Sequence, residues 1–275
     1  MAIITISRGS YSRGKEVAEK VAERLGYECI ARDMLIEASG HSHIPEIKLV
    51  RAIHDAPSIL DRFTYSKEKY IAHIQAALVQ HVRHDNVVYH GLAGHFFLKG
   101  VPHVLKIRII AELEDRINQE MHREHISYKE ALSILKKDDE QRRKWSKSLY
   151  GIDTSDPSLY DLVLHIKKIS VDDAVDVICH TVGLNTFETT PQSQKAMDDL
   201  SLACEVKARL INIKGDIEVY ADGGIVTVKT KTDASAESKL TRDIRRTAGD
   251  IPGVKGVRVE VIYPVLYRGP RSTSR

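Results

Sequence analysis

The sequence predicts an α/β protein in which a parallel sheet is flanked by helices, followed by a small α+β domain. The first observation is a short, β-branched apolar run, Ile3–Ile6, that leads into a glycine-containing loop and then an amphipathic helix. The second is that apolar runs at 87–89, 104–110 and 159–166 alternate with long helical patterns, as parallel sheets covered on both faces do. The third is a change in the sequence pattern near Gly183, where a polar stretch without hydrophobic periodicity separates two sets of predicted helices and strands.

The N-terminal elements follow from their hydrophobic spacing. The run Ile3–Ile6 is typical of a buried parallel strand. Val17, Val21 and Leu25 lie on one helical stripe, and Gly26 is expected to end that helix. The loop between strand and helix is therefore expected at the carboxyl end of the strand, where open α/β sheets bind ligands.

The C-terminal elements have a different order. We expect a first domain over 1–183, a linker over 184–193, a second domain over 194–263 and a basic flexible tail over 264–275. A helical pattern through Leu200 and Leu210 precedes two alternating strands joined by Asp222-Gly223-Gly224, a strong hairpin signal. A second helix from about Ala234 and a last alternating strand complete an αββαβ unit. Each domain completes its own hydrophobic pattern, so we expect the linker to be exposed and cleavable.

Composition narrows the class of protein. The 275 residues include 41 basic and 38 acidic side chains, and this near balance argues against a protein built to bind nucleic acid. The three cysteines lie far apart without a CxxC pair, which fits a reducing compartment, and the histidines lack zinc-site spacing. No apolar run approaches the length of a membrane span, so a soluble, cytoplasmic protein is expected.

The loop after the first strand has the spacing of a phosphate-binding loop. Gly9, four residues, Gly14 and Lys15 stand directly after a strand and directly before a helix. Such glycines let backbone N–H groups turn toward phosphate, and the lysine adds a mobile positive charge. The alternative is a strand-to-helix turn that contains glycines and binds nothing.

Three stretches, residues 4–27, 86–117 and 136–178, resemble the cytidylate kinase-like family of P-loop nucleoside monophosphate kinases. The resemblance covers residues 1–183 and keeps the family's order. It implies a P-loop kinase core, ATP as donor, Mg²⁺, and phosphoryl transfer to a nucleotide acceptor such as CMP. The metal ligands stay unknown at this point.

The same resemblance implies the site residues. Lys15, Arg142 and Lys147 are expected to be catalytic, because a phosphoryl transition state spreads charge that cations neutralise. Asp139-x-x-Arg142 resembles a motif of the family's mobile lid. Without the resemblance, the basic run 142–144 would be read as a solvated helix face. The nucleotide-binding residues expected are Gly9, Ser10, Ser12, Arg13, Gly14, Lys15, Glu16, Arg32, Asp33, Arg116, Arg123, Asp139 and Arg142.

Several positions depart from the family's pattern. Tyr11 and Arg13 replace loop glycines, and Glu16 stands where a hydroxyl would hold magnesium. The family's Gly-Arg-Gly becomes 91–93 Gly-Leu-Ala, which removes a base near the acceptor, and Ala31 replaces an acid. These departures favour an alternative, a catalytically weakened nucleotide-binding sensor that signals through its C-terminal domain.

Residues 196–263 resemble a BON domain, a small αββαβ module, although Thr230 replaces its usual glycine. The resemblance implies binding of phospholipid or another ligand, or oligomeric assembly. Cations at Lys239, Arg242, Arg245 and Arg246 could face an anionic lipid or an acidic protein partner. A solvated helix face is the alternative interpretation of these residues.

Overall fold

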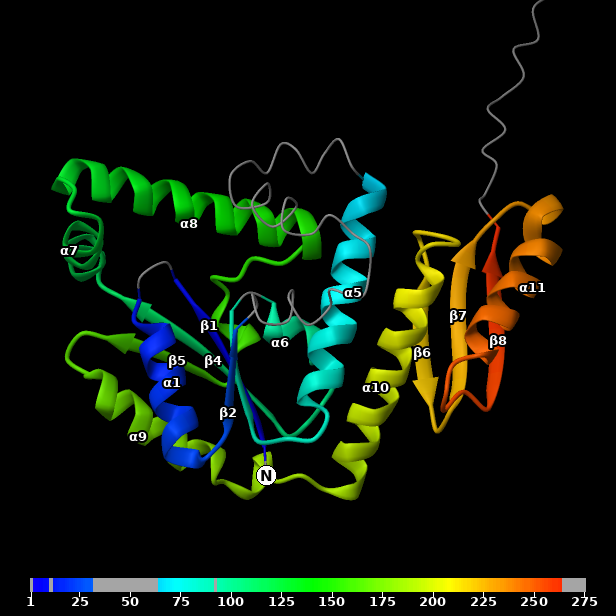
Figure 1. Ribbon diagram of the computed structural model, residues 1–275, viewed down its shortest axis with the longest axis horizontal. Helices are drawn as coiled ribbons and strands as arrows, with labels where there is room; N and C mark the ends of the chain where they lie inside the picture. The colour runs from blue at the N-terminus through cyan, green and yellow to red at the C-terminus, as the bar shows by residue number, and fades with distance from the viewer. Residues whose placement is uncertain (1, 10–11, 32–63, 92, 264–275) are drawn as a thin grey trace, which may run out of the picture.

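The computed structural model describes residues 2–9, 12–31, 64–91 and 93–263 (Figure 1). Ser10, Tyr11, Arg32, Asp33 and Leu92, named above as site residues or departures, lie outside the described residues. The tail expected over 264–275 also lies outside them.

A five-stranded parallel sheet forms the first part of the chain. Its strands are β1 (Ile3–Arg8), β2 (Glu28–Ala31), β3 (Val87–His90), β4 (Val104–Ala111) and β5 (Leu162–Ile166). They lie in the order β2-β3-β1-β4-β5, and every pairing is parallel. The predicted parallel sheet flanked by helices is confirmed, with β1 at its centre.

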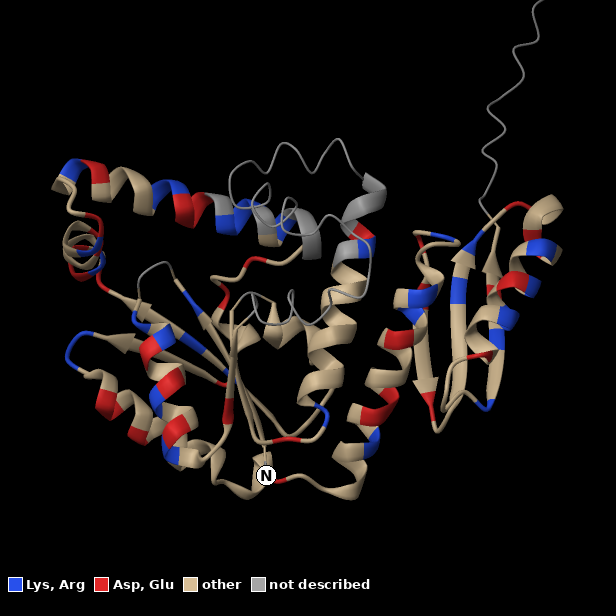
Figure 2. Ribbon diagram, in the orientation of Figure 1, with Lys and Arg blue, Asp and Glu red and all other residues tan. Residues whose placement is uncertain are grey.

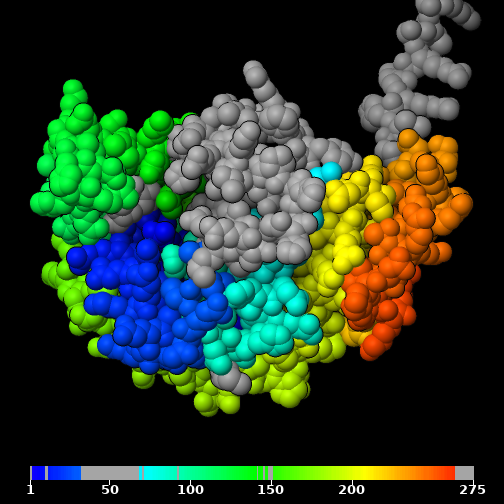
Figure 3. All heavy atoms as spheres, viewed as in Figure 1, coloured from blue at the N-terminus to red at the C-terminus, as the bar shows by residue number. Residues whose placement is uncertain are grey.

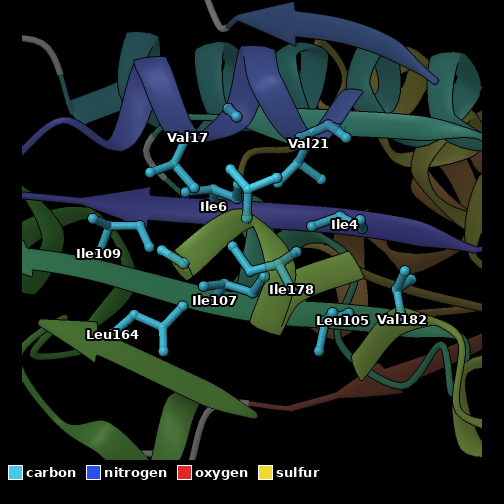
Figure 4. Close-up of a cluster of buried hydrophobic side chains, with 14 of the residues drawn as sticks. Ile4, Ile6, Val17, Val21, Leu105, Ile107, Ile109, Leu164, Ile178 and Val182 are labelled. Carbon is cyan, nitrogen blue, oxygen red and sulfur yellow. The ribbon is translucent and has the colours of Figure 1, made fainter. Parts of the chain in front are cut away.

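One face of this sheet is covered by α1 (Gly14–Leu25) and α9 (Val171–Val182). Figure 4 shows the side chains between them: Val17 and Val21 from α1 and Ile178 from α9 meet isoleucines of β1 and β4. Ile4, Ile6 and Ile107 are fully buried, and each such side chain stabilises the fold by about 1.5–3 kcal/mol relative to an exposed one. Gly26 ends α1 in the left-handed conformation, as predicted.

The opposite face is covered by α5 (Thr64–Val82), α6 (Gly94–Phe97) and part of α10 (Pro191–Leu210). Ile3 and Tyr89 of the sheet and Leu78 of α5 are fully buried in this second cluster. Beyond β4, α7 (Leu113–Glu124) and α8 (Tyr128–Tyr150) form a helical pair that lies over the carboxyl ends of the strands (Figure 1).

The C-terminal part has the predicted αββαβ order. After α10 come β6 (Glu218–Asp222), β7 (Ile225–Lys231), α11 (Ala234–Gly249) and β8 (Gly256–Ile262). The sheet order is β6-β7-β8, with β6 antiparallel and β8 parallel to β7. Gly223 and Gly224 both take positive φ in the hairpin, and Val226, Val228 and Ile244 form a fully buried core.

The segment expected as an aperiodic linker contains regular structure. It holds a 3₁₀ turn, Asn185–Phe187, and α10 begins inside it at Pro191. The helix starts there because the Thr190 side chain caps it and proline suits the first helical position. Thr189 also donates a 2.6 Å hydrogen bond to Asp85.

Helix α10 contributes to both hydrophobic cores. Met197 and Cys204 are buried in the cluster that covers the parallel sheet, whereas Val206 and Leu210 are buried with the C-terminal sheet. Figure 3 shows this helix, in yellow, lying between α5 and the orange and red C-terminal strands and helix. The two parts of the chain therefore share a helix.

Charged side chains are spread over both parts of the molecule, as Figure 2 shows for α8 and α11. Within the described residues, no helix combines the length and apolar character needed to cross a membrane.

Candidate phosphate-binding site

A cavity of about 240 Å³ lies at the carboxyl ends of β1 and β4. The parallel register places Ser7 beside Arg108 and Arg8 beside Ile109, so two polar strand ends meet there. The cavity is lined by Ser7, Arg8, Gly9, Ser12, Arg108, Ile110, Ala111, Arg116, Asp139, Arg142, Arg143, Asp153, Thr154 and Ser155. Five arginines against two aspartates give it a strongly positive lining, which suits a polyanion.

The loop after β1 is tied to β4 rather than to α1 alone. The Gly9 N–H donates to the Ile109 carbonyl at 3.3 Å. The Ser12 hydroxyl, almost fully buried, donates to the carbonyl oxygens of Gly9 and Ile109, 3.1 Å away in each case. Ser12 therefore contributes to the site mainly by fixing the path of the loop.

Among the described residues of this loop, Arg13 takes the left-handed conformation, with φ 61°, whereas Gly9 and Gly14 do not take positive φ. Glycine is the residue that adopts this conformation without cost, so the backbone keeps a turn that the side chain does not favour. Gly14 is required for a different reason. A Cβ added there would lie 2.6 Å from Cβ of Arg8, closer than real atoms approach.

Lys15 and Glu16 are not among the cavity's lining residues. The Lys15 ammonium lies 3.6 Å from Glu19, and its side chain is 62% exposed. Glu16 lies 3.6 Å from the Arg13 guanidinium and 3.9 Å from the Lys20 ammonium. The sequence spacing predicted that Glu16 would lie beside a phosphate. In the structure its negative charge is neutralised by Arg13 and Lys20.

The helical pair supplies three further arginines to the cavity. Arg116 of α7 donates two hydrogen bonds, 2.8 and 2.9 Å long, to the carboxylate of Asp139 on α8. Both bonds come from one guanidinium nitrogen, Nη2, and they couple the two helices. Arg142 and Arg143 follow one helical turn later, and both line the cavity.

A polar cluster surrounds Arg108, which lines the cavity. Arg108 donates to the carbonyl of Thr154 and, at 3.3 Å, to the hydroxyl of Tyr160. That hydroxyl donates in turn to the Thr154 carbonyl at 2.9 Å. His95 of α6 packs against the Tyr160 ring, with centroids 4.7 Å apart. Burial, with the charges of Arg108 and Lys106, lowers the pKa of His95 to about 3, so it is neutral at physiological pH.

The rim of the cavity carries Asp153. Hydrogen bonds from the side chain and N–H of Ser155 lower the pKa of its carboxyl group, and the charges of Arg143 and Lys147 lower it further. Lys147 itself is exposed on α8 and does not line the cavity. Within the described ranges, no group of three or more His, Cys, Asp or Glu side chains could hold a metal ion.

The structure brings five of the expected nucleotide-binding residues to one cavity: Gly9, Ser12, Arg116, Asp139 and Arg142. Lys15, Lys147 and Arg123 lie outside its lining, and Arg123 pairs with Glu120 at 3.1 Å on α7. Sequence reasoning missed Arg8 and Arg108, and it considered Arg143 only as part of the basic run 142–144. For Arg8 and Arg108 the available signal was a polar residue at the carboxyl end of each central strand, because such ends meet at one edge of a parallel sheet.

The fold and this cavity define a class: a P-loop kinase-like α/β protein with an arginine-rich site under a helical pair. A solved structure of an uncharacterized protein from Eubacterium ventriosum shares the fold, with a TM-score of 0.52 at 23% identity, over 66% of this chain and 98% of that one.

The family follows from sequence comparison. The family model of the cytidylate kinase-like family matches residues 3–168, so the chain belongs to that family. A cytidylate kinase of Methanosarcina acetivorans is 37% identical over 99 residues, which are 36% of this chain and about half, 54%, of the relative. A cytidylate kinase of Pyrococcus horikoshii is 25% identical over 64% of this chain and 85% of the relative. Both alignments cover only part of this chain.

Proposed function

We propose that this protein transfers the γ-phosphoryl group of ATP to a nucleotide acceptor such as CMP. The observation that carries the proposal is the cavity at the ends of β1 and β4, lined by five arginines and covered by α7 and α8. Family membership and the names of the relatives support the reaction class.

The chain's own residues would act by positioning and by charge. In this proposal the loop around Gly9 and Ser12 holds the donor phosphates at the start of α1. Arg116, oriented by Asp139, and Arg142 neutralise charge that develops on the transferred group. Phosphoryl transfer of this kind needs no dedicated general base, which agrees with a cavity dominated by arginine.

A magnesium ion would arrive with the nucleotide. Mg²⁺ is commonly bound through substrate phosphates and one or two carboxylates rather than by an all-protein cage. The cavity offers two carboxylates, and Asp139 is engaged by Arg116. Asp153 accepts hydrogen bonds from Ser155 through Oδ1, so its other oxygen could support a phosphate-bound ion, which would supply charge neutralisation.

On the acceptor side, residues 91–93 depart from the Gly-Arg-Gly pattern that the resemblance implies. Ala93, at the position of the last glycine of that pattern, takes φ 72°, a conformation that favours glycine. We therefore leave the acceptor open within the nucleoside monophosphates and propose CMP as the first to test.

The test is a coupled assay of the full chain with ATP and Mg²⁺ against CMP, dCMP, UMP and AMP. Turnover of at least one acceptor, lost in Arg142→Ala and kept in the exposed α1 variant Arg24→Ala, supports the proposal. ATP binding with no turnover of any acceptor would overturn it in favour of a nucleotide-responsive binding protein.

For the C-terminal domain we propose a BON-like binding role, supported by its αββαβ order. Sedimentation with anionic vesicles tests it: Arg245→Glu with Arg246→Glu should weaken binding that falls with salt. Absence of salt-sensitive binding would contradict the lipid version.

A further inference from the structure

Arg8, at the end of β1, lines the cavity, whereas Lys15, at the usual lysine position of a phosphate-binding loop, does not. In the usual motif the lysine directly follows the last glycine of the loop, at the start of the helix. Here α1 begins at Gly14, and Arg13, which replaces a loop glycine, holds the left-handed conformation before it. The turn into α1 is therefore kept, but the cation next to the cavity is Arg8.

Gly14 has no side chain, and the stem of Arg8 fills the space beside it. A Cβ built on Gly14 would lie 2.6 Å from Cβ, 3.0 Å from Cδ and 3.4 Å from Cγ of Arg8. The whole aliphatic stem of Arg8 thus lies across the first residue of α1. A side chain at Gly14 and the observed path of Arg8 exclude each other.

Arg8 lines the cavity together with Gly9, Ser12 and Arg108. Lys15, the cation that the sequence spacing favours, is absent from the lining and lies 3.6 Å from Glu19. Of these two cations, Arg8 is therefore the one that the fold places at the site.

We propose that Arg8, at the end of β1, supplies the positive charge for the terminal phosphates of the donor in place of the loop lysine. The inference rests on the proposed function, because it requires a nucleoside triphosphate in this cavity. A guanidinium offers several N–H donors in a fixed fork, which suits bidentate contact with phosphate oxygens better than an ammonium does.

The experiment measures binding of ATP, inorganic tripolyphosphate and adenosine to the full chain by calorimetry. The variant Arg8→Met keeps an apolar stem across Gly14 and removes the charge. We expect it to weaken ATP and tripolyphosphate binding by about 10- to 100-fold, the range for losing a charge-assisted contact. Lys15→Ala should weaken both by less than about threefold, the range of an exposed charge. Arg24→Ala is the matched control for loss of an exposed arginine on α1.

Comparison of the three ligands separates a phosphate-binding role from a structural one. Arg8→Met should weaken binding of ATP and tripolyphosphate but change adenosine binding by less than about threefold, because adenosine carries no phosphate for Arg8 to contact. Urea unfolding of each variant identifies any loss of affinity that comes from unfolding. An equal loss of adenosine binding, or a larger loss for Lys15→Ala than for Arg8→Met, would overturn the inference.

The remaining outcomes distinguish the proposed role of Arg8 from the proposed kinase activity. Wild-type turnover that Arg8→Met leaves unchanged overturns the role of Arg8 and leaves the kinase proposal standing. Triphosphate binding that depends on Arg8 without any turnover supports the role of Arg8 and overturns the kinase proposal. A wild-type chain that binds neither ATP nor tripolyphosphate overturns both.

Discussion

His95 makes the stability of the fold depend on pH in a predictable way. It is 5% exposed, its Nε2 has no hydrogen-bond partner among the described residues, and its pKa is lowered to about 3. An unfolded histidine titrates near 6.5. Below that pH the unfolded chain binds a proton that the folded chain does not, so stability falls as pH decreases from 6.5 toward 3.

The magnitude follows from the gap between these two values. Each pH unit below 6.5 removes about 1.4 kcal/mol, so at about pH 5 the loss from this residue is about 2 kcal/mol, and near pH 7.5 it is close to zero. The variant His95→Phe keeps an aromatic ring against Tyr160 and cannot titrate.

Urea unfolding at about pH 7.5 and about pH 5, for the wild type and His95→Phe, measures the effect. Other groups titrate equally in both proteins, so the fall in unfolding free energy should be about 2 kcal/mol larger in the wild type. An equal fall in the two proteins would refute the reasoning. It would show that the polar cluster around Arg108 accepts a charged His95.

Three further predictions concern other parts of the fold. Met197 is buried in the core over the parallel sheet, so Met197→Ala should lower the free energy of unfolding by about 2–5 kcal/mol. The control Leu184→Ala, at an exposed position, should change it by less than about 0.5 kcal/mol. A similarly small effect at Met197 would mean that α10 does not belong to that core. Arg13→Gly should stabilise the chain by about 0.5–1 kcal/mol by relieving the left-handed arginine, and a destabilised variant in thermal unfolding would contradict this. Cys204, whose pKa burial raises to about 12, should resist alkylation in the folded protein near neutral pH, and rapid labelling there would show that α10 detaches.

The sequence predicted the elements better than the site. Strand β1, the Asp222-Gly223-Gly224 hairpin and the end of α1 at Gly26 are local features, set by residue period and turn chemistry, and all three appear where expected. The start of α10 was missed because Pro191 was interpreted only as a breaker. Thr190 before it and Ser193 after it form a capping box that was the available signal.

Only part of the site was predicted from the sequence. Some of its residues are brought together by their spacing along one helix, and others only by the pairing of strands. Asp139 and Arg142 share one helix face, so their spacing alone places them together. Arg8 and Arg108 come from strands that are adjacent only through long-range pairing of β1 with β4. The spacing of Gly14 and Lys15 pointed to the lysine, whereas the backbone conformation at Arg13 and the packing at Gly14 are visible only in three dimensions.

The central claim is that the arginine-lined cavity binds the phosphates of a nucleoside triphosphate. Calorimetric titration of the full chain with ATP and with adenosine, at low and at moderate salt, tests it most directly. We predict that ATP binds, that adenosine binds at least about 100-fold more weakly, and that ATP affinity falls as salt rises, because charge-assisted contacts to phosphate dominate. Adenosine binding as tightly as ATP, or ATP affinity that is independent of salt, would contradict the account.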